Sequence, residues 1–279
     1  LSENGNISTV TGRQIVRELE YASNSTVGFY SGYETLDVSP SDVLTSATFD
    51  YKQMAGNVTI SGLEQIQNSG TEAVINLLES RIGVLEKSMS NTLSTSLYSD
   101  GTGTSGKEVG GLQLLVADAG TGTVGGINSS TYTFWQNAQT TATSSAFSTT
   151  NIQADMNTIY LSLVRGADSP DLIMADTNAY KSFLGSLQAI QRVTSDRVAT
   201  SGFTSVQYLN SDVIFDDACP TNKMDFLNTD YLRLEVAANR NFVPGEAKMS
   251  VNQDAMVTPM YWSGNLTCSN RALQGVIHV

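Results

Sequence analysis

The stretch from Ser69 to Leu97, SGTEAVINLLESRIGVLEKSMSNTLSTSL, decides the fold. Ser69 and Glu72 have the spacing of a capping box, in which two side chains satisfy backbone N–H groups at a helix start. Apolar side chains then recur at steps of three and four: Val74, Leu77, Leu78, Ile82, Leu85, Met89, Leu93 and Leu97. This pattern predicts one amphipathic helix of roughly 28 residues, about 40 Å long, ended by the glycines after Asp100. We expect Leu78, Ile82, Leu85 and Met89 to be buried along one helix face.

Extended segments precede this helix. Residues 1–11 are polar and predict an arm, and Thr11–Gln14 has capping-box form, which predicts a short helix over residues 15–19. Two apolar runs over residues 27–38 and 47–60 flank the turn signal at Ser39–Asp42 and predict a long hairpin. Because a lone hairpin holds no core, we expect it to lie on a neighbouring surface.

The residues after the helix fall into two segments of different composition. Residues 101–150 are rich in Gly, Ser and Thr, and from residue 151 an α/β pattern begins. It predicts helices over 152–164 and, capped by Thr177, over 177–190, and strands over 171–175, 206–215 (a pair), 224–227 and 231–236. Residues 255–279 predict long strands that are broken at Pro259 and at 263–265.

Composition excludes several classes of function. Among 279 residues, 15 Lys and Arg against 27 Asp and Glu give a net charge of −12, and no basic stretch suits nucleic-acid binding. No apolar run approaches the roughly 20 residues of a membrane helix. One histidine, His278, and two cysteines, Cys219 and Cys268, supply neither a zinc site nor a well-placed Ser-His-Asp triad, and the cysteines are expected as free buried thiols. We recognise no signal peptide, and a first residue Leu1 is typical of a processed or longer chain.

Four patterns remain as candidate sites. Gly120–Gly125 has the letters G-x-G-x-x-G, but no helical pattern follows and no acidic residue occurs from Thr121 through Asn151, so a flexible glycine loop is the better interpretation. Three nearby aspartates lack the spacing of an EF-hand calcium loop: Asp212, Asp216 and Asp217. Glycosylation sequons are expected by chance in so polar a chain, and they occur at Asn6, Asn24, Asn57, Asn128 and Asn265. A group of aromatic residues lacks the cationic neighbours of a base-stacking surface and favours core or subunit contacts: Tyr132, Phe134, Trp135, Tyr261 and Trp262. We therefore expect no catalytic, cofactor-binding or metal-binding residues.

The order of elements, with an arm, an extended hairpin, a long helix, an α/β lobe and returning strands, resembles the Hong Kong 97-type major capsid proteins of tailed bacteriophages. Short phrases strengthen the resemblance: Gly110–Leu112, Gly122–Ile127, Thr131–Trp135 and Tyr231–Val236. The resemblance implies an α+β capsid fold. It places the N-terminal arm at residues 1–25, the extended loop at 26–66, the peripheral domain at 67–106 with its return strands at 241–279, and the axial domain at 107–240.

The resemblance also implies a function. The chain would be a structural protein and no enzyme, self-assembling into hexamers and pentamers of an icosahedral head that encloses double-stranded DNA. Portal, scaffolding or decoration proteins would be its further partners, with no membrane partner, and it would be assembled in the host cytoplasm and reside in the virion. Two alternatives stay open: an encapsulin-like compartment shell, and an exported adhesin or surface-layer subunit, which the Ser, Thr and Asn content favours.

Overall fold

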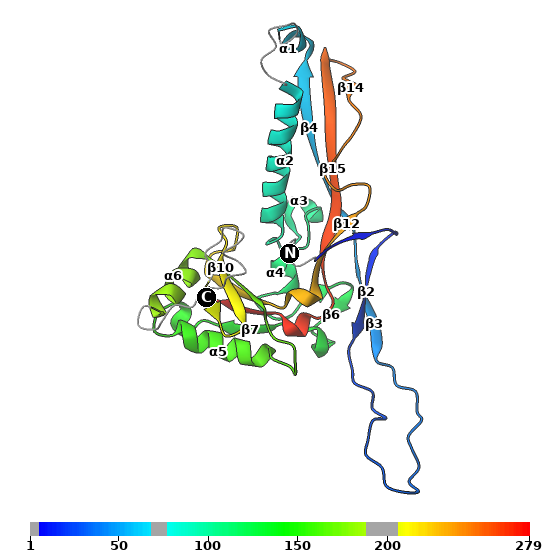
Figure 1. Ribbon diagram of the computed structural model, residues 1–279, viewed down its shortest axis with the longest axis vertical. Coiled ribbons are helices and arrows are strands. Elements are labelled where there is room, and N and C mark those ends of the chain that lie inside the picture. Colours follow the sequence, from blue (N-terminus) through cyan, green and yellow to red (C-terminus); the bar gives the residue numbers. More distant parts are fainter. Residues whose placement is uncertain (1–5, 68–76, 188–205) are drawn as a thin grey trace.

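The structure, a computed structural model, describes residues 6–67, 77–187 and 206–279. An upright arm rises from a lower lobe, and a thin loop projects downward beside the lobe (Figure 1). We use "the arm" for helix α2 (Leu77–Ser96) with strands β4 (Lys52–Ser61) and β15 (Ala255–Cys268), and "the lobe" for the second sheet and its two helices, α5 (Ile152–Leu163) and α6 (Thr177–Ser186).

The arm is built on β15. Ten residues of β15 pair antiparallel with all ten residues of β4, and the other side of β15 pairs with β12 (Leu232–Ala237), β13 (Val243–Pro244) and β14 (Lys248–Met249). Strand β1 (Ile7–Val10) adds in parallel to β12. The expectation that Pro259 breaks the strand is wrong. Its carbonyl oxygen accepts a hydrogen bond from Gly245 N, so the edge of β15 on which Pro259 lacks an N–H faces the gap between β13 and β14. The expected break at 263–265 is also wrong, since β15 continues through it.

Helix α2 confirms the predicted long helix from Leu77 onward, while the capping box at 69–72 lies outside the described residues. Met89 is buried and Ile82 and Leu85 are partly buried against the core, but Leu78 is exposed. The expectation for Leu78 is wrong because α2 rests on one face of a narrow sheet, which covers only part of its apolar stripe.

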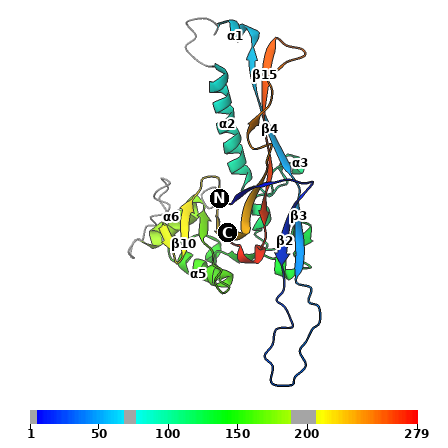
Figure 2. The same ribbon diagram turned by 45° about the vertical axis from the view of Figure 1, so that its right-hand side comes forward.

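The lobe confirms the predicted α/β pattern. Its sheet has the order β7-β16-β11-β8-β10-β9, with α5 and α6 packed against it (Figure 2). The strand bounds are β7 Ala138–Thr141, β8 Leu172–Ala175, β9 Val206–Tyr208, β10 Ser211–Phe215, β11 Lys223–Leu227 and β16 Gly275–His278. Asp176, and not Thr177, caps α6, accepting from Ala179 N at 2.8 Å, and residues 188–190 of that predicted helix lie outside the described residues.

The predicted helix over residues 15–19 is wrong. These residues form β2 (Ile15–Glu20), which pairs antiparallel with β3 (Leu44–Phe49). Ile15 and Leu19 are buried, and with Arg17 they fall on one side of the strand at a spacing of two. The pairing partner lies more than 20 residues away, so a local capping-box pattern does not reveal it.

The predicted hairpin is also wrong in its pairing. The first of its two runs, residues 27–38, forms no strand. The second run contains two strands with different partners, since β3 pairs with β2 and β4 pairs with β15. The two-stranded ribbon β2–β3 is therefore a stem. It carries residues 21–43, which we call the projecting loop.

Shorter elements complete the fold. They are α1 Gly62–Gln67, α3 Gly103–Gly106, α4 Leu112–Leu115, β5 Thr123–Val124, β6 Ile127–Asn128 and the 3-10 helices Thr133–Trp135, Thr143–Ser145, Thr229–Tyr231 and Arg271–Leu273. Two cores result. The first spans the arm, the stem and one face of the lobe sheet, and the second lies between the other face of that sheet and the helices α5 and α6.

Candidate functional site

The projecting loop presents apolar side chains to solvent. The exposed fractions of six residues are Val27 83%, Phe29 109%, Tyr30 67%, Tyr33 107%, Leu36 58% and Val38 91%. Scattered exposed apolar residues are ordinary, but a group of them on one thin projection marks an interaction surface. Figure 1 shows that this loop extends away from both the arm and the lobe, so its own chain does not cover it.

A glycine contact fixes the stem from which this loop departs. Gly125, with φ +60°, lies in the hairpin β5–β6, and a Cβ there would stand 2.6 Å from Ala47 Cβ in β3. Gly125 O accepts from Thr48 N at 2.9 Å, and Trp135 Nε1 donates to Val124 O at 3.0 Å. The predicted glycine loop is thus a packed hairpin, in which strand β6 and not a helix follows the glycines directly.

A buried carboxylate attaches the N-terminal strands. Glu235 on β12 is 3% exposed and accepts from Arg17 Nη1 at 3.2 Å and from the hydroxyl of Ser8. Asn6 Nδ2 donates to Thr229 O at 2.8 Å. These bonds hold β1 and β2 across β12, and hence set the direction in which the stem points.

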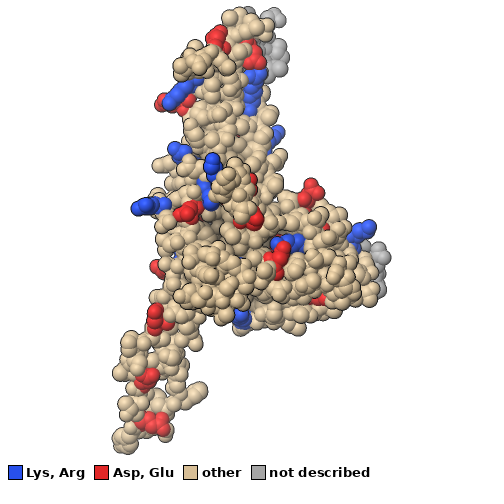
Figure 3. Space-filling view, turned by 180° about the vertical axis from the view of Figure 1, so that it is seen from behind, with Lys and Arg blue, Asp and Glu red and all other residues tan. Residues whose placement is uncertain are grey.

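The projecting loop and the arm differ in the signs of the charged residues that they carry. Between Tyr21 and Tyr51 the chain carries four acidic residues and no Lys or Arg: Glu34, Asp37, Asp42 and Asp50. In the rear view of Figure 3 the projection shows acidic groups only, whereas basic groups are spread over the arm. The arm therefore carries cations that the projecting loop lacks.

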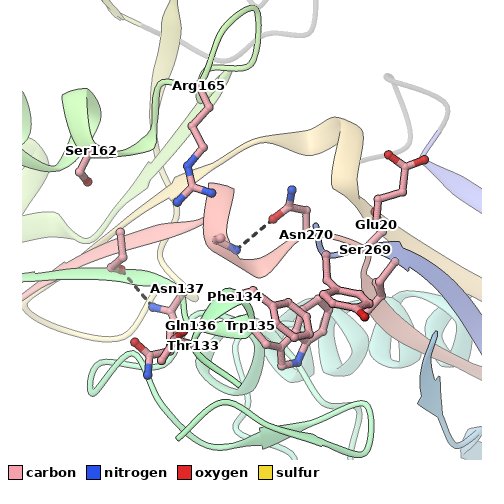
Figure 4. Close-up of a pocket in the computed structure, with 14 residues that line it drawn as sticks. Glu20, Thr133, Phe134, Trp135, Gln136, Asn137, Ser162, Arg165, Ser269 and Asn270 are labelled. Carbon is pink, nitrogen blue, oxygen red and sulfur yellow. Dashed lines mark hydrogen bonds between the residues drawn. The ribbon is translucent and has the colours of Figure 1, made fainter. Parts of the chain in front are cut away.

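A polar pocket lies beside the stem (Figure 4). Its volume is about 350 Å³, and its lining includes Glu20, Arg165 and Asn270. The rings of Tyr21 and Phe134, which are tilted by 31° with centroids 5.2 Å apart, also line it. Asn270 Oδ1 accepts from Ala272 N, and so serves the local turn. The lining offers one carboxylate and one guanidinium, which suit a polar contact.

The three candidate aspartates do not converge. Asp216 accepts from the hydroxyl of Tyr98 at 2.6 Å, Asp212 is buried in the lobe sheet, and Asp217 is exposed. In the described ranges, no group of three potential His, Cys, Asp or Glu ligands gathers. No described helix is both long and apolar enough to span a membrane.

Both cysteines are free and buried, as expected. Burial raises the pKa of Cys268 to about 12 and also raises that of Cys219, so neither thiol ionises readily at neutral pH. His278 ends β16, with Nε2 3.4 Å from Gln139 Oε1.

The aromatic and sequon residues have mixed positions. Trp135 and Trp262 are core residues and Tyr132 is exposed, while Arg240 stacks over Tyr261 at 5.0 Å. Asn6 and Asn265 are buried, and the other sequon residues are exposed: Asn24, Asn57 and Asn128. The sequence analysis missed the buried polar groups Glu235, Arg271 and Asp225, whose burial depends on distant pairing.

Comparisons with known proteins give matches in structure only. No family model matches the sequence, and no curated protein matches it. Among solved structures, the capsid of cyanophage A-1(L) aligns over 98% of this chain and 90% of its own, with TM-score 0.77 and 15% identity. The holo-SrpI encapsulin complex of Synechococcus elongatus PCC 7942 aligns over 99% and 86%, with TM-score 0.65 and 8% identity. The capsid of Myoviridae phage XM1 aligns over 99% and 90%, with TM-score 0.63 and 10% identity.

The two phage capsid matches cover nearly the whole of this chain and about nine tenths of their own. The chain therefore has the Hong Kong 97-type fold of phage capsid shells, which encapsulin shells share.

Proposed function

We propose that this chain is the major capsid protein of a tailed bacteriophage, which self-assembles into hexamers and pentamers of an icosahedral head around double-stranded DNA. Its role is structural and not catalytic. In this proposal residues 1–25 are the N-terminal arm, which reaches between subunits, and residues 26–66 are the extended loop. Residues 67–106 and 241–279 form the peripheral domain, and residues 107–240 form the axial domain near the local symmetry axes.

The exposed apolar group on the projecting loop carries this proposal. Burying a large apolar side chain stabilises by about 1.5–3 kcal/mol, so six of them represent on the order of 10 kcal/mol before the costs of association. Isolated subunits forgo that stabilisation. A closed shell recovers it at every subunit, because cyclic contacts repeat the same loop-to-neighbour interface around each capsomer.

The same role accounts for the partners and the location that we propose. A head needs a portal, and scaffolding or decoration proteins are further candidates for its surfaces. The shell would be built in the host cytoplasm and end in the virion. The net charge of −12 supports DNA enclosure without tight binding, since phosphate contacts need clustered cations.

The test replaces the apolar side chains of the projecting loop in the full chain, with Val27, Phe29, Tyr33, Leu36 and Val38 all changed to Ser. Because these side chains are exposed, the variant should unfold at the wild-type temperature yet form no closed shells by electron microscopy. The matched control changes polar positions of the same loop, Ser31, Thr35 and Ser39, to Ala and should assemble. Normal shells from the serine variant would refute the proposed role of the loop.

An encapsulin-like compartment is the second candidate, favoured by the encapsulin match at TM-score 0.65. The two functions differ in contents. Shells purified from an infected or expressing host should hold nuclease-protected DNA if the chain is a capsid protein, and a protein cargo without DNA if it is a compartment shell. An adhesin or surface-layer subunit would instead give fibres or flat sheets at the cell surface.

A further inference from the structure

Asp225 occupies a position where the fold requires an apolar residue. Alternate residues of β11 face the two cores, with Met224 and Phe226 in the second core and Leu227 in the first. Asp225 faces the same side as Leu227, is 1% exposed, and has uncharged neighbours on the flanking strands, Met174 and Val276. Among the described residues neither carboxyl oxygen has a hydrogen-bond partner. A buried ionised carboxylate without a partner is strongly disfavoured.

A buried cation shares this face of β11 with the carboxyl group. Lys223, two residues earlier and on the same face, is 4% exposed, and its Nζ binds Asp118 Oδ1 at 2.7 Å. Asp118 is 54% exposed. The buried ammonium is thus paired with the solvent-exposed carboxylate, while the fully buried one is left alone.

The other titratable groups around Asp225 do not compensate it. The Tyr98 hydroxyl, just beyond α2, donates to Asp216, and the Cys219 thiol contributes only repulsion if ionised. Burial raises the pKa of Asp225 to about 7; Lys223 opposes this rise and Asp118 adds to it. The observed arrangement is therefore stable while Asp225 keeps its proton.

We propose that Lys223 exchanges partners, binding Asp118 while Asp225 is protonated and binding Asp225 once it is ionised. One ammonium and two carboxylates define two discrete states. In the second state the buried charges neutralise each other, and Asp118 is released to solvent, where a carboxylate is well hydrated.

The exchange reaches the foot of the stem through short connections. Asp118 lies in a turn that the side chain of Asn137 holds by two hydrogen bonds to Ala117. Asn137 Oδ1 accepts from Ala117 N at 3.2 Å, and Asn137 Nδ2 donates to Ala117 O at 2.9 Å. This turn leads into the hairpin β5–β6, whose Gly125 O binds Thr48 N in β3. Protonation in the lobe sheet thereby controls how firmly residues 117–128 support the stem of the projecting loop.

The direction with pH follows from the raised pKa. Asp225 is protonated in the observed arrangement below about pH 7, so that arrangement loses population as the pH rises through 7. Hydrogen–deuterium exchange of the full chain at pH 6 and pH 8, corrected for the intrinsic exchange rate, should show protection of residues 117–128 falling at least threefold at pH 8.

Three variants decide the proposal. Asp225→Asn has no ionisable group and should keep the pH 6 protection at both pH values. Asp118→Asn, at a half-exposed position that does not endanger folding, should give low protection at both. Asp217→Asn, an exposed aspartate nearby, should behave as wild type. Equal protection of the wild type at both pH values, or an unchanged pH dependence in either Asp118→Asn or Asp225→Asn, would overturn partner exchange by Lys223.

Discussion

Arg271 shows how a single buried charge joins distant parts of this chain. It is fully buried, and no carboxylate among the described residues pairs with it. Its Nε, Nη1 and Nη2 donate to Leu115 O at 2.7 Å, Trp135 O at 3.0 Å and Asn137 Oδ1 at 2.9 Å. Burial lowers the pKa of Arg271 to about 10, so the guanidinium stays charged at neutral pH. It therefore fastens the segment 115–137 to the turn before β16.

Replacing Arg271 by Ala leaves Leu115 O and Trp135 O without this donor, while Asn137 Oδ1 still accepts from Ala117 N. Each unsatisfied group costs about 1–3 kcal/mol, so we expect Arg271→Ala to lower the free energy of unfolding by roughly 2 kcal/mol or more. Denaturant unfolding measures this loss. Arg233→Ala, at an exposed position on β12, is the control and should change stability by less than about 0.5 kcal/mol. Similar small losses for both would show that the Arg271 bonds do not matter for stability.

Asp225 gives a pH-dependent stability. Its pKa rises from 3.8 to about 7 on folding, so its contribution is lost as the pH rises from about 4 to about 7, with an upper limit of about 4 kcal/mol. If Lys223 moves from Asp118 to the ionised Asp225, as proposed above, this loss of stability becomes smaller. In denaturant titrations across this range, the wild type should lose stability relative to Asp225→Asn, and parallel curves for the two proteins would contradict the assignment.

At the scale of elements, α2 approaches β4 closely because residue 56 is Gly. A Cβ on Gly56 would stand 2.4 Å from Leu85 Cδ1 and 3.3 Å from Met89 Sδ. Residue 56 faces α2 together with the buried Val58 and Ile60. The contact therefore sets how tightly the long helix packs on its sheet.

Gly56→Ala should lower the free energy of unfolding by about 1–3 kcal/mol through overpacking. Leu85→Ala alone should cost about 2 kcal/mol, near the low end for a core leucine because Leu85 is only partly buried. The double variant should be less destabilised than the sum, since removing the leucine makes room for the new methyl group. Strict additivity would show that the two residues do not meet.

The sequence reveals elements whose cause is local, and misses those whose cause is distant. The apolar stripe of α2 and the strands of the lobe follow from periodicity within each segment. The local capping-box pattern predicts a helix where the structure has strand β2. The pairing of β2 with β3, which is distant along the chain, decides its structure instead. Residues 47–60 were assigned to one hairpin arm because nothing local shows that β4 pairs with β15, some 200 residues later.

The candidate site was predictable in part for the same reason. The apolar residues of the projecting loop are visible in the sequence, and their lack of a nearby cover predicts a partner. Glu235, Lys223 and Asp225 look like ordinary strand residues. Only the alternation of β11 and β12 between buried faces, which depends on the whole fold, shows that their charges lie inside.

At the scale of the molecule, the charge distribution predicts weak DNA binding. The basic residues of the described chain are spread over the arm and the lobe, and the projecting loop carries none (Figure 3). Folded subunits should bind duplex DNA no more tightly than about 10⁻⁴–10⁻⁶ M at physiological salt. Fluorescence anisotropy at several salt concentrations measures this, and nanomolar affinity with a steep salt dependence would reveal a basic face elsewhere.

The central claim is that one chain builds a closed shell. Cryo-electron microscopy of the full chain, expressed alone and with the genes that flank its own, tests it most directly. We predict closed particles with six-fold and five-fold capsomers in which the projecting loop of each subunit is covered by a neighbour. Monomers, fibres or flat sheets under both conditions, or shells in which Phe29 and Tyr33 stay exposed to solvent, would contradict the account.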